Sequence, residues 1–113
     1  MLHYKIYSQQ HEEWVVLVHG AGGSSTIWYK QIRAYRKHFN VLVVDLRGHG
    51  ACRIDNSPST YTLDLVSQDI LEVLDALNIK KAHFVGVSLG TMLIRQLAET
   101  NPERFHTMIL AGA

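Results

Sequence analysis

The sequence is poor in cysteine, in excess charge and in long apolar runs. A single cysteine excludes any disulfide within the chain and is typical of a reducing compartment. The 11 basic residues against 10 acidic ones leave a net charge of +1, which gives no electrostatic basis for binding nucleic acid. No apolar run is long enough to span a bilayer, and the first residues lack the apolar core of a signal peptide. We therefore expect a cytoplasmic protein with no nucleic-acid or membrane partner.

Repeats, linkers and low-complexity segments are also absent from the sequence. The seven histidines are scattered without the spacing of metal ligands, so no metal site is expected. With 113 residues, of which 47% are hydrophobic, the chain can form one domain with one core but not two.

Apolar runs that predict buried strands alternate with amphipathic segments that predict helices. The strand-like runs are residues 14–18, 41–44, 82–87 and 107–110, with a further edge strand at 2–8 that a hairpin-type loop at 9–13 follows. The helical segments are residues 26–37, 62–77 and 91–99. In the first of these helices the inner side is expected to carry Ile27, Trp28, Ile32 and Tyr35. The alternation predicts an α/β fold, in which helices cover both faces of a mostly parallel sheet in three layers.

One short motif, G-x-S-x-G at residues 86–90, links the run 82–87 to the helix after it. A serine on a sharp strand-to-helix turn needs glycines two residues to either side, because a Cβ there would collide with the reversing backbone. The turn exposes the hydroxyl of Ser88 at the carboxyl end of the sheet, and the helix N-terminus favours an oxyanion beside it. The motif therefore predicts a nucleophile elbow, with Ser88 as a catalytic nucleophile rather than a plain helix N-cap.

A second glycine-rich loop allows a different interpretation. Residues 20–25 follow a strand-like run and open a helix, and Asp45 ends the next run, as in a dinucleotide-binding loop. Ser25 stands where that pattern has its third glycine or alanine, and the pattern leaves the motif at 86–90 without a role. Dinucleotide binding is therefore the weaker alternative, and no cofactor is expected.

Four blocks of sequence, in this order and spacing, resemble the α/β-hydrolase superfamily. They are His19-Gly20, residues 45–50, residues 86–90 and residues 101–104. The resemblance implies a serine hydrolase of the carboxylesterase type, which cleaves an ester or a related acyl bond of a small-molecule substrate through an acyl-enzyme on Ser88. It also implies an oxyanion hole formed by the backbone N–H groups of Ala21 and Leu89.

The same resemblance implies which residues surround the substrate. The candidate pocket residues are His19, Gly20, Trp28 and His49. His19 is expected to hold the oxyanion loop by hydrogen bonds rather than to act as a base. Trp28 is expected to lie either in the hydrophobic core or in the wall of the pocket. Asp45 is expected to be a structural residue of its loop.

The resemblance covers only the first half of the family's fold. The family's acid and histidine follow strands that this chain does not contain, whereas Glu99, Glu103 and His106 match helix or strand positions. We expect residues 1–113 to be the N-terminal part of a single α/β-hydrolase domain, truncated before the cap and the C-terminal strands and inactive by itself. A non-catalytic assembly module is the alternative function. The run at Thr107-Leu110 is expected to form an exposed edge, a candidate surface for self-association.

Overall fold

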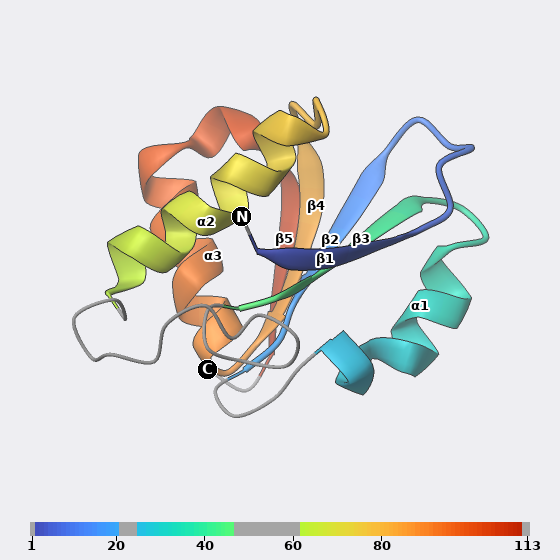
Figure 1. Cartoon of the computed structure of the whole chain (residues 1–113), viewed down its shortest axis with the longest axis horizontal. Helices are drawn as coiled ribbons and strands as arrows, with labels where there is room; N and C mark the ends of the chain where they lie inside the picture. The colour runs from blue at the N-terminus through green and yellow to red at the C-terminus, as the bar shows by residue number, and fades with distance from the viewer. Residues whose placement is uncertain (1, 21–24, 47–61, 112–113) are drawn as a thin grey trace.

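A single mixed sheet organises the structure, a computed structural model that describes residues 2–20, 25–46 and 62–111 (Figure 1). Its strands are β1 (His3–Tyr7), β2 (Trp14–Val18), β3 (Asn40–Asp45), β4 (Ala82–Val87) and β5 (Phe105–Ala111). They lie in the order β1-β3-β2-β4-β5, with β1 antiparallel to β3 and all other neighbours parallel. The carboxyl ends of the four parallel strands therefore meet at one end of the sheet, which is where ligands bind in open α/β sheets.

Helices cover both faces of this sheet (Figure 1). On one face lies α1 (Tyr29–Tyr35), which the short 3-10 turn η1 (Ser25–Trp28) precedes. On the other face lie α2 (Leu63–Ala76) and α3 (Leu89–Thr100). The result is three layers, with the sheet in the middle.

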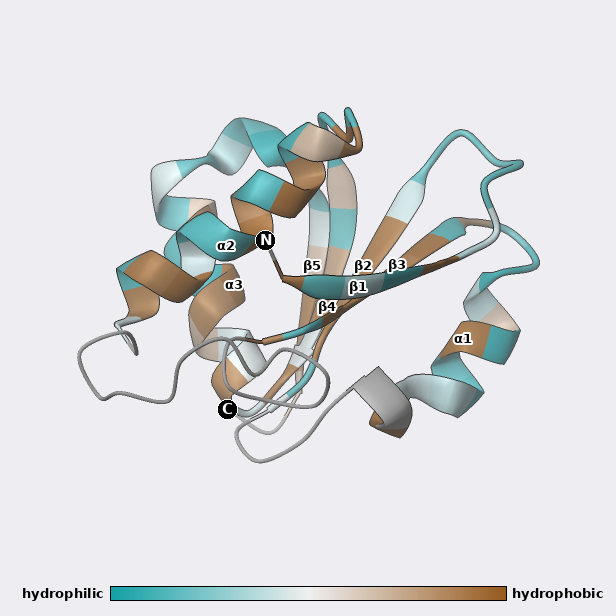
Figure 2. Ribbon diagram, viewed as in Figure 1, coloured by the Kyte–Doolittle hydropathy of each residue, from teal (hydrophilic) through white to brown (hydrophobic). Residues whose placement is uncertain are grey.

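Each face of the sheet has its own core, because successive side chains of a strand point to opposite sides. Val16 and Val18 of β2 belong to the core under α2 and α3. Val15 and Leu17 of the same strand belong to the smaller core under α1. Figure 2 shows β2 and β3 as largely hydrophobic along their length, as expected for strands that are covered on both sides.

Local sequence signals set the ends of α2. The hydroxyl oxygen of Thr62 accepts a hydrogen bond from the backbone N–H of Leu65 at 3.1 Å, which caps the first turn. The helix ends at Ala76, and Asn78 then adopts the left-handed conformation with φ 58°. Both ends agree with the helix expected at 62–77.

The predicted α/β fold, a mostly parallel sheet between helices, is confirmed. Two local expectations are wrong. The loop at 9–13 does not close a hairpin, because β3 lies between β1 and β2. Ile27 does not face the core, since it is 45% exposed. The reason is that the chain forms a 3-10 turn there, with a tighter period than the α-helix that begins at Tyr29.

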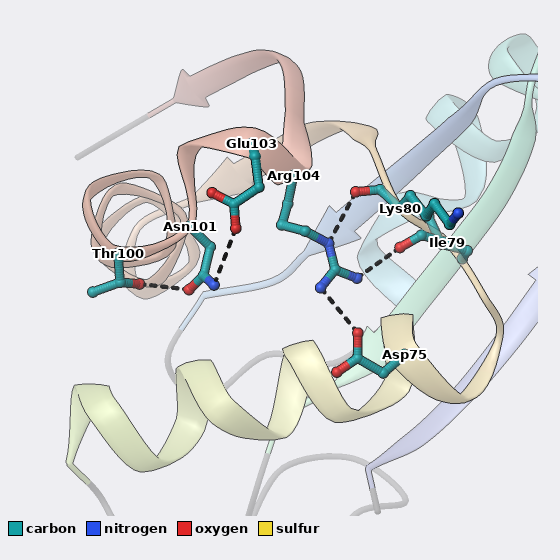
Figure 3. Close-up of polar contacts among 7 residues, drawn as sticks. All are labelled: Asp75, Ile79, Lys80, Thr100, Asn101, Glu103 and Arg104. Atoms are coloured by element: carbon teal, nitrogen blue, oxygen red, sulfur yellow. Dashed lines mark hydrogen bonds and ion pairs between the residues drawn. The ribbon is translucent and has the colours of Figure 1, made fainter.

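At the amino ends of the strands, Arg104 ties the segment before β5 to the end of α2. The 3-10 turn η3 (Pro102–Arg104) places it there. Its guanidinium donates to the carbonyl oxygens of Ile79 at 2.7 Å and Lys80 at 2.9 Å, and it pairs with Oδ1 of Asp75 at 2.9 Å (Figure 3). These contacts lie just before β4 begins, far from the carboxyl ends of the strands, so the role of Arg104 is structural.

Candidate active site

Ser88 lies on the turn between the last residue of β4 and the first residue of α3. Its backbone has φ 54° and ψ −117°, and a positive φ costs energy for any residue that carries a Cβ. Such strain persists only where the surrounding structure holds it, and it concentrates at functional sites. The side chain is exposed at the carboxyl end of the sheet, which is the position that a nucleophile elbow requires.

The glycines on either side of Ser88 leave no room for a side chain. A Cβ on Gly86 would lie 2.6 Å from Cδ1 of Ile94 and 2.9 Å from the carbonyl oxygen of Gly90. A Cβ on Gly90 would collide with the carbonyl oxygen of Val18, at the end of β2. Strand and helix pack this closely because both positions lack a Cβ, which explains the glycines of the motif.

Two neighbours hold the backbone of Ser88 in its strained conformation. Its N–H donates to the carbonyl oxygen of Ala111 at 3.2 Å, at the end of β5. Its carbonyl oxygen accepts from the backbone N–H of Thr91 at 2.9 Å and from the Thr91 hydroxyl at 2.6 Å. Sequence reasoning missed Thr91, although a hydroxyl three residues after a helix N-cap can bond back to that residue.

The loop after β2 passes directly beside Ser88. A Cβ on Gly20 would lie 2.9 Å from Cβ of Ser88 and 3.5 Å from its Oγ. The buried ring of His19 accepts a hydrogen bond at Nε2 from the N–H of Leu46, at 2.9 Å. The proton of this ring is therefore on Nδ1, which lies 2.7 Å from the carbonyl oxygen of Gly20. With both ring nitrogens bonded, His19 holds the loop and is poorly placed to accept a proton from Ser88.

Electrostatic stabilisation beside the serine comes from α3. Leu89 is the first residue of this helix, so its N–H has no partner within the helix. The N-terminus of the helix also carries a partial positive charge that favours an anion next to Ser88.

Among the other predicted site residues, Trp28 is buried in the core under α1, and its role in a pocket stays a prediction. Ala21 and His49 lie outside the described residues.

Histidine and carboxylate pairs occur in the described part of the chain, but away from Ser88. Nδ1 of His3 lies 3.1 Å from Oδ2 of Asp45, on β1 and at the end of β3. With strands about 4.8 Å apart, β1 is about 14 Å from β4 in this sheet order. His83 and Glu13 pair at 3.0 Å near the amino ends of β4 and β2, opposite the serine. No acid and histidine in the described ranges are therefore placed together to activate the hydroxyl.

The amino ends of β4 and β5 carry a polar cluster without a role in this site. His83 bonds through Nδ1 to the hydroxyl of Thr107 at 2.7 Å and through Nε2 to Glu13. The ring of His106 lies against that of His83, with centroids 5.0 Å apart. The hydrogen bond from His83 lowers the pKa of Glu13 below 4.5, and the charges of His83 and His106 act in the same direction. Sequence reasoning missed the cluster because it depends on the register between β4 and β5.

A hollow of about 590 Å³ lies between the end of α2 and η3, at the same end of the sheet as this polar cluster. Its lining includes Lys80, Lys81 and Arg104, but the Arg104 guanidinium is already bonded to protein groups.

In the described ranges no three His, Cys, Asp or Glu side chains are arranged to hold a metal ion. No helix in those ranges is long and apolar enough to cross a membrane.

Comparison with known proteins shows the same fold over almost the whole chain. A family model described as alpha/beta hydrolase fold matches residues 13–113. The 3-oxoadipate enol-lactonase 1 of Acinetobacter baylyi is 32% identical over 99 residues, which are 88% of this chain and 36% of that protein. A solved hydrolase from Pseudomonas aeruginosa PA01 is 37% identical, with a TM-score of 0.90 over 96% of this chain and 40% of its own.

A solved enol-lactonase from Burkholderia xenovorans LB400 is 34% identical, with a TM-score of 0.88 over 95% of this chain and 41% of its own. The chain spans about 40% of the length of these relatives. A family model that matches nearly all of the chain, together with solved structures of the same topology, shows the family directly. The chain belongs to the α/β-hydrolase fold family.

Proposed function

We propose that the protein is a serine hydrolase of the carboxylesterase type, which cleaves an ester or a related acyl bond of a small molecule. The strained turn at Ser88 is the observation that carries this proposal, because it presents a hydroxyl between the Gly20 loop and the N-terminus of α3. Relatives that are named as enol-lactonases support it, since a lactone is a cyclic ester.

In the proposed reaction, Oγ of Ser88 attacks the carbonyl carbon of the substrate and its proton passes to a general base. The carbonyl oxygen becomes an oxyanion, which accepts hydrogen bonds from the N–H groups of Leu89 and Ala21. Each such donor contributes about 3 kcal/mol to transition-state stabilisation. The intermediate then expels the alcohol, which takes up a proton, and leaves the acyl group on Ser88. Water attacks this acyl-enzyme, releases the carboxylic acid and restores the serine.

We also propose that these 113 residues are the N-terminal part of one hydrolase domain, and that the acid and the histidine belong to sequence beyond them. Support comes from the 36–41% of each relative's length that the chain spans. The distance of the His3–Asp45 and His83–Glu13 pairs from β4's carboxyl end supports it too. A serine without its base is a weak nucleophile, so the chain by itself is a poor esterase.

Hydrolysis of p-nitrophenyl acetate tests both parts of the proposal. We expect a turnover well below about 1 per second, the low end for enzymes. We also expect this turnover to disappear in Ser88→Ala, whereas Thr100→Ala, which removes an exposed hydroxyl at the other end of α3, leaves it unchanged.

The two parts fail in different ways. If Ser88→Ala retains the full residual rate, the serine is not a nucleophile and the chain is a non-catalytic module. If the unaltered chain turns over at 1 per second or faster and depends on Ser88, a base is present within these residues and the proposal of a missing one is wrong. Labelling by a fluorophosphonate probe gives an independent measure of the same nucleophile.

A further inference from the structure

The peptide group between Ser88 and Leu89 carries two groups that matter to the site. One is the carbonyl oxygen of Ser88, which accepts hydrogen bonds from the N–H of Thr91 at 2.9 Å and from its hydroxyl at 2.6 Å. The other is the N–H of Leu89, the proposed donor to the oxyanion. The peptide is trans and planar, so its C=O and its N–H point in opposite directions. The direction of the carbonyl group therefore fixes the direction of the N–H.

The backbone of Ser88 does not favour this orientation by itself. A residue with a side chain and a positive φ usually adopts the left-handed conformation, in which ψ is about +47°. Ser88 combines φ 54° with ψ −117°, which is about 160° away from that value. Because ψ sets the direction of the carbonyl group, contacts with neighbouring groups must hold this peptide in place.

Thr91 makes such contacts from a buried position. Its side chain is fully buried, so water does not compete for the hydroxyl. The hydroxyl bond of 2.6 Å is at the short end of the range for O–H···O bonds. Both donors of Thr91 draw the carbonyl oxygen of Ser88 into the first turn of α3, so the N–H of Leu89 points out of the helix N-terminus.

The helix itself does not need a hydroxyl at this position. The backbone N–H of Thr91 already satisfies the carbonyl oxygen of Ser88, and threonine is a poorer helix former than alanine. The other threonine near the end of α3, Thr100, is exposed and bonds to the carbonyl oxygen of Gln96 at 3.2 Å. The buried hydroxyl of Thr91 differs because it adds a second, shorter bond to the one carbonyl group that sets the direction of the Leu89 N–H.

We propose that Thr91 is a positioning residue, whose hydroxyl holds the Ser88–Leu89 peptide so that the N–H of Leu89 is directed at the oxyanion before the reaction begins. A donor that is fixed in advance needs no reorganisation when the charge develops. The inference rests on the proposed function of Ser88. The two residues lie three positions apart in the described part of the chain, and the contact between them involves no residue outside it.

NMR spectroscopy tests the orientation of the peptide without any need for activity. Residual dipolar couplings of the isotope-labelled, weakly aligned chain report the direction of each backbone N–H. Thr91→Ser and Thr91→Ala both lose the methyl group, but only Thr91→Ala loses the hydroxyl. We expect the coupling of Leu89 to change in Thr91→Ala, while the couplings in the later turns of α3 stay the same. Thr91→Ser should keep the coupling of the unaltered chain.

An unchanged coupling of Leu89 in Thr91→Ala overturns the proposal. Thr91→Val lacks the hydroxyl but keeps the volume of the side chain. It provides the same test if Thr91→Ala loses the circular dichroism spectrum of the folded chain.

The Ser88-dependent hydrolysis of p-nitrophenyl acetate tests the consequence for the reaction. Removal of a whole oxyanion donor costs about 100- to 1,000-fold in kcat, so a misdirected donor should cost about tenfold. We expect this loss in the kcat of Thr91→Ala, with KM within about twofold, because the oxyanion forms only as the reaction proceeds. Thr91→Ser should recover most of the rate, and Thr100→Ala is the control on the same helix.

The inference and the proposed function fail in different ways. Equal losses of kcat in Thr91→Ser and Thr91→Ala would assign the effect to the missing methyl group and overturn the role of the hydroxyl. A full residual rate in Ser88→Ala would contradict the proposed function, and the role of Thr91 towards an oxyanion would fall with it. The dipolar coupling of Leu89 would still show whether Thr91 orients the peptide.

Discussion

At the scale of single residues, Gly90 shows how tightly the elbow is built. An exposed position in a helix gains about 1 kcal/mol when glycine is replaced by alanine. Gly90 is different, because its Cβ would meet the carbonyl oxygen of Val18 and lie 2.9 Å from that of His19. Both contacts are backbone groups of β2 and its loop, so they cannot move aside as a flexible side chain can.

We therefore expect Gly90→Ala to lower the free energy of unfolding by at least about 2 kcal/mol, from overpacking between α3 and β2. Urea denaturation that is followed by circular dichroism measures this change. Met92→Ala, on the exposed side of the same helix, serves as the control and should change the midpoint little. A stabilised Gly90→Ala variant would mean that the turn at Ser88 is not held against β2 as described.

At the scale of elements, Arg104 joins α2, the loop before β4 and the start of β5. Its bonds to the carbonyl oxygens of Ile79 and Lys80 need the planar fork of a guanidinium, which lysine lacks. Its ion pair with Asp75 is a weaker contribution, because that carboxylate side chain is 66% exposed and screened by water.

Arg104→Lys should therefore cost about 2 kcal/mol in the free energy of unfolding, since both carbonyl bonds are lost. Asp75→Asn should cost less than about 1 kcal/mol. Thermal unfolding of the two variants in one buffer gives the comparison. Equal losses in both would show that the ion pair, rather than the bonds to the carbonyl groups, holds the elements together.

The polar cluster of Glu13, His83 and His106 connects β2, β4 and β5 and gives stability a dependence on pH. The hydrogen bond from His83 is the main cause of the lowered pKa of Glu13. A carboxylate with a lowered pKa in the folded state stabilises the protein above its unfolded value, here 4.5, and loses that contribution as pH falls through the folded value. The affected window therefore lies below pH 4.5.

In His83→Gln we expect the pKa of Glu13 to rise towards 4.5, so that the variant is less stable than the unaltered chain above pH 4.5 and loses less stability as the pH falls below it. His106→Gln should shift the pKa in the same direction by less, because His106 acts only through its charge at a longer distance. An NMR titration of the Glu13 carboxyl group in the three proteins measures both shifts. No shift in His83→Gln would contradict the hydrogen bond at 3.0 Å.

At the scale of the whole molecule, the sequence predicts the elements better than their arrangement. The apolar runs and the Thr62 cap mark β2, β3, β4 and α2, because the burial of both strand faces and the capping of a helix are local properties. The place of β1 beside β3 was not predictable, because the choice between a hairpin and an inserted strand depends on packing across the sheet.

The candidate site also combines features that the sequence predicts with features that it does not predict. The glycines at 86 and 90 predict a sharp turn at Ser88, and the structure has that turn. The bonds that hold Ser88, from Thr91 and to Ala111, depend on how α3 and β5 meet, which no local pattern encodes. The roles of Ala21 and His49 stay predictions, since both lie outside the described residues.

The strand order has a consequence for how the chain folds. None of the strands that are neighbours in the sheet are joined by a tight turn, since a helix or another strand separates each pair along the chain. The bond between His3 and Asp45 spans 42 residues, and the bond between Glu13 and His83 spans 70. Folding must therefore close long loops before the contacts that stabilise them form, which places it among the slower domains, in the range of about milliseconds to seconds. During synthesis, the apolar strand β2 keeps one side unpaired until the ribosome has released the whole of β4.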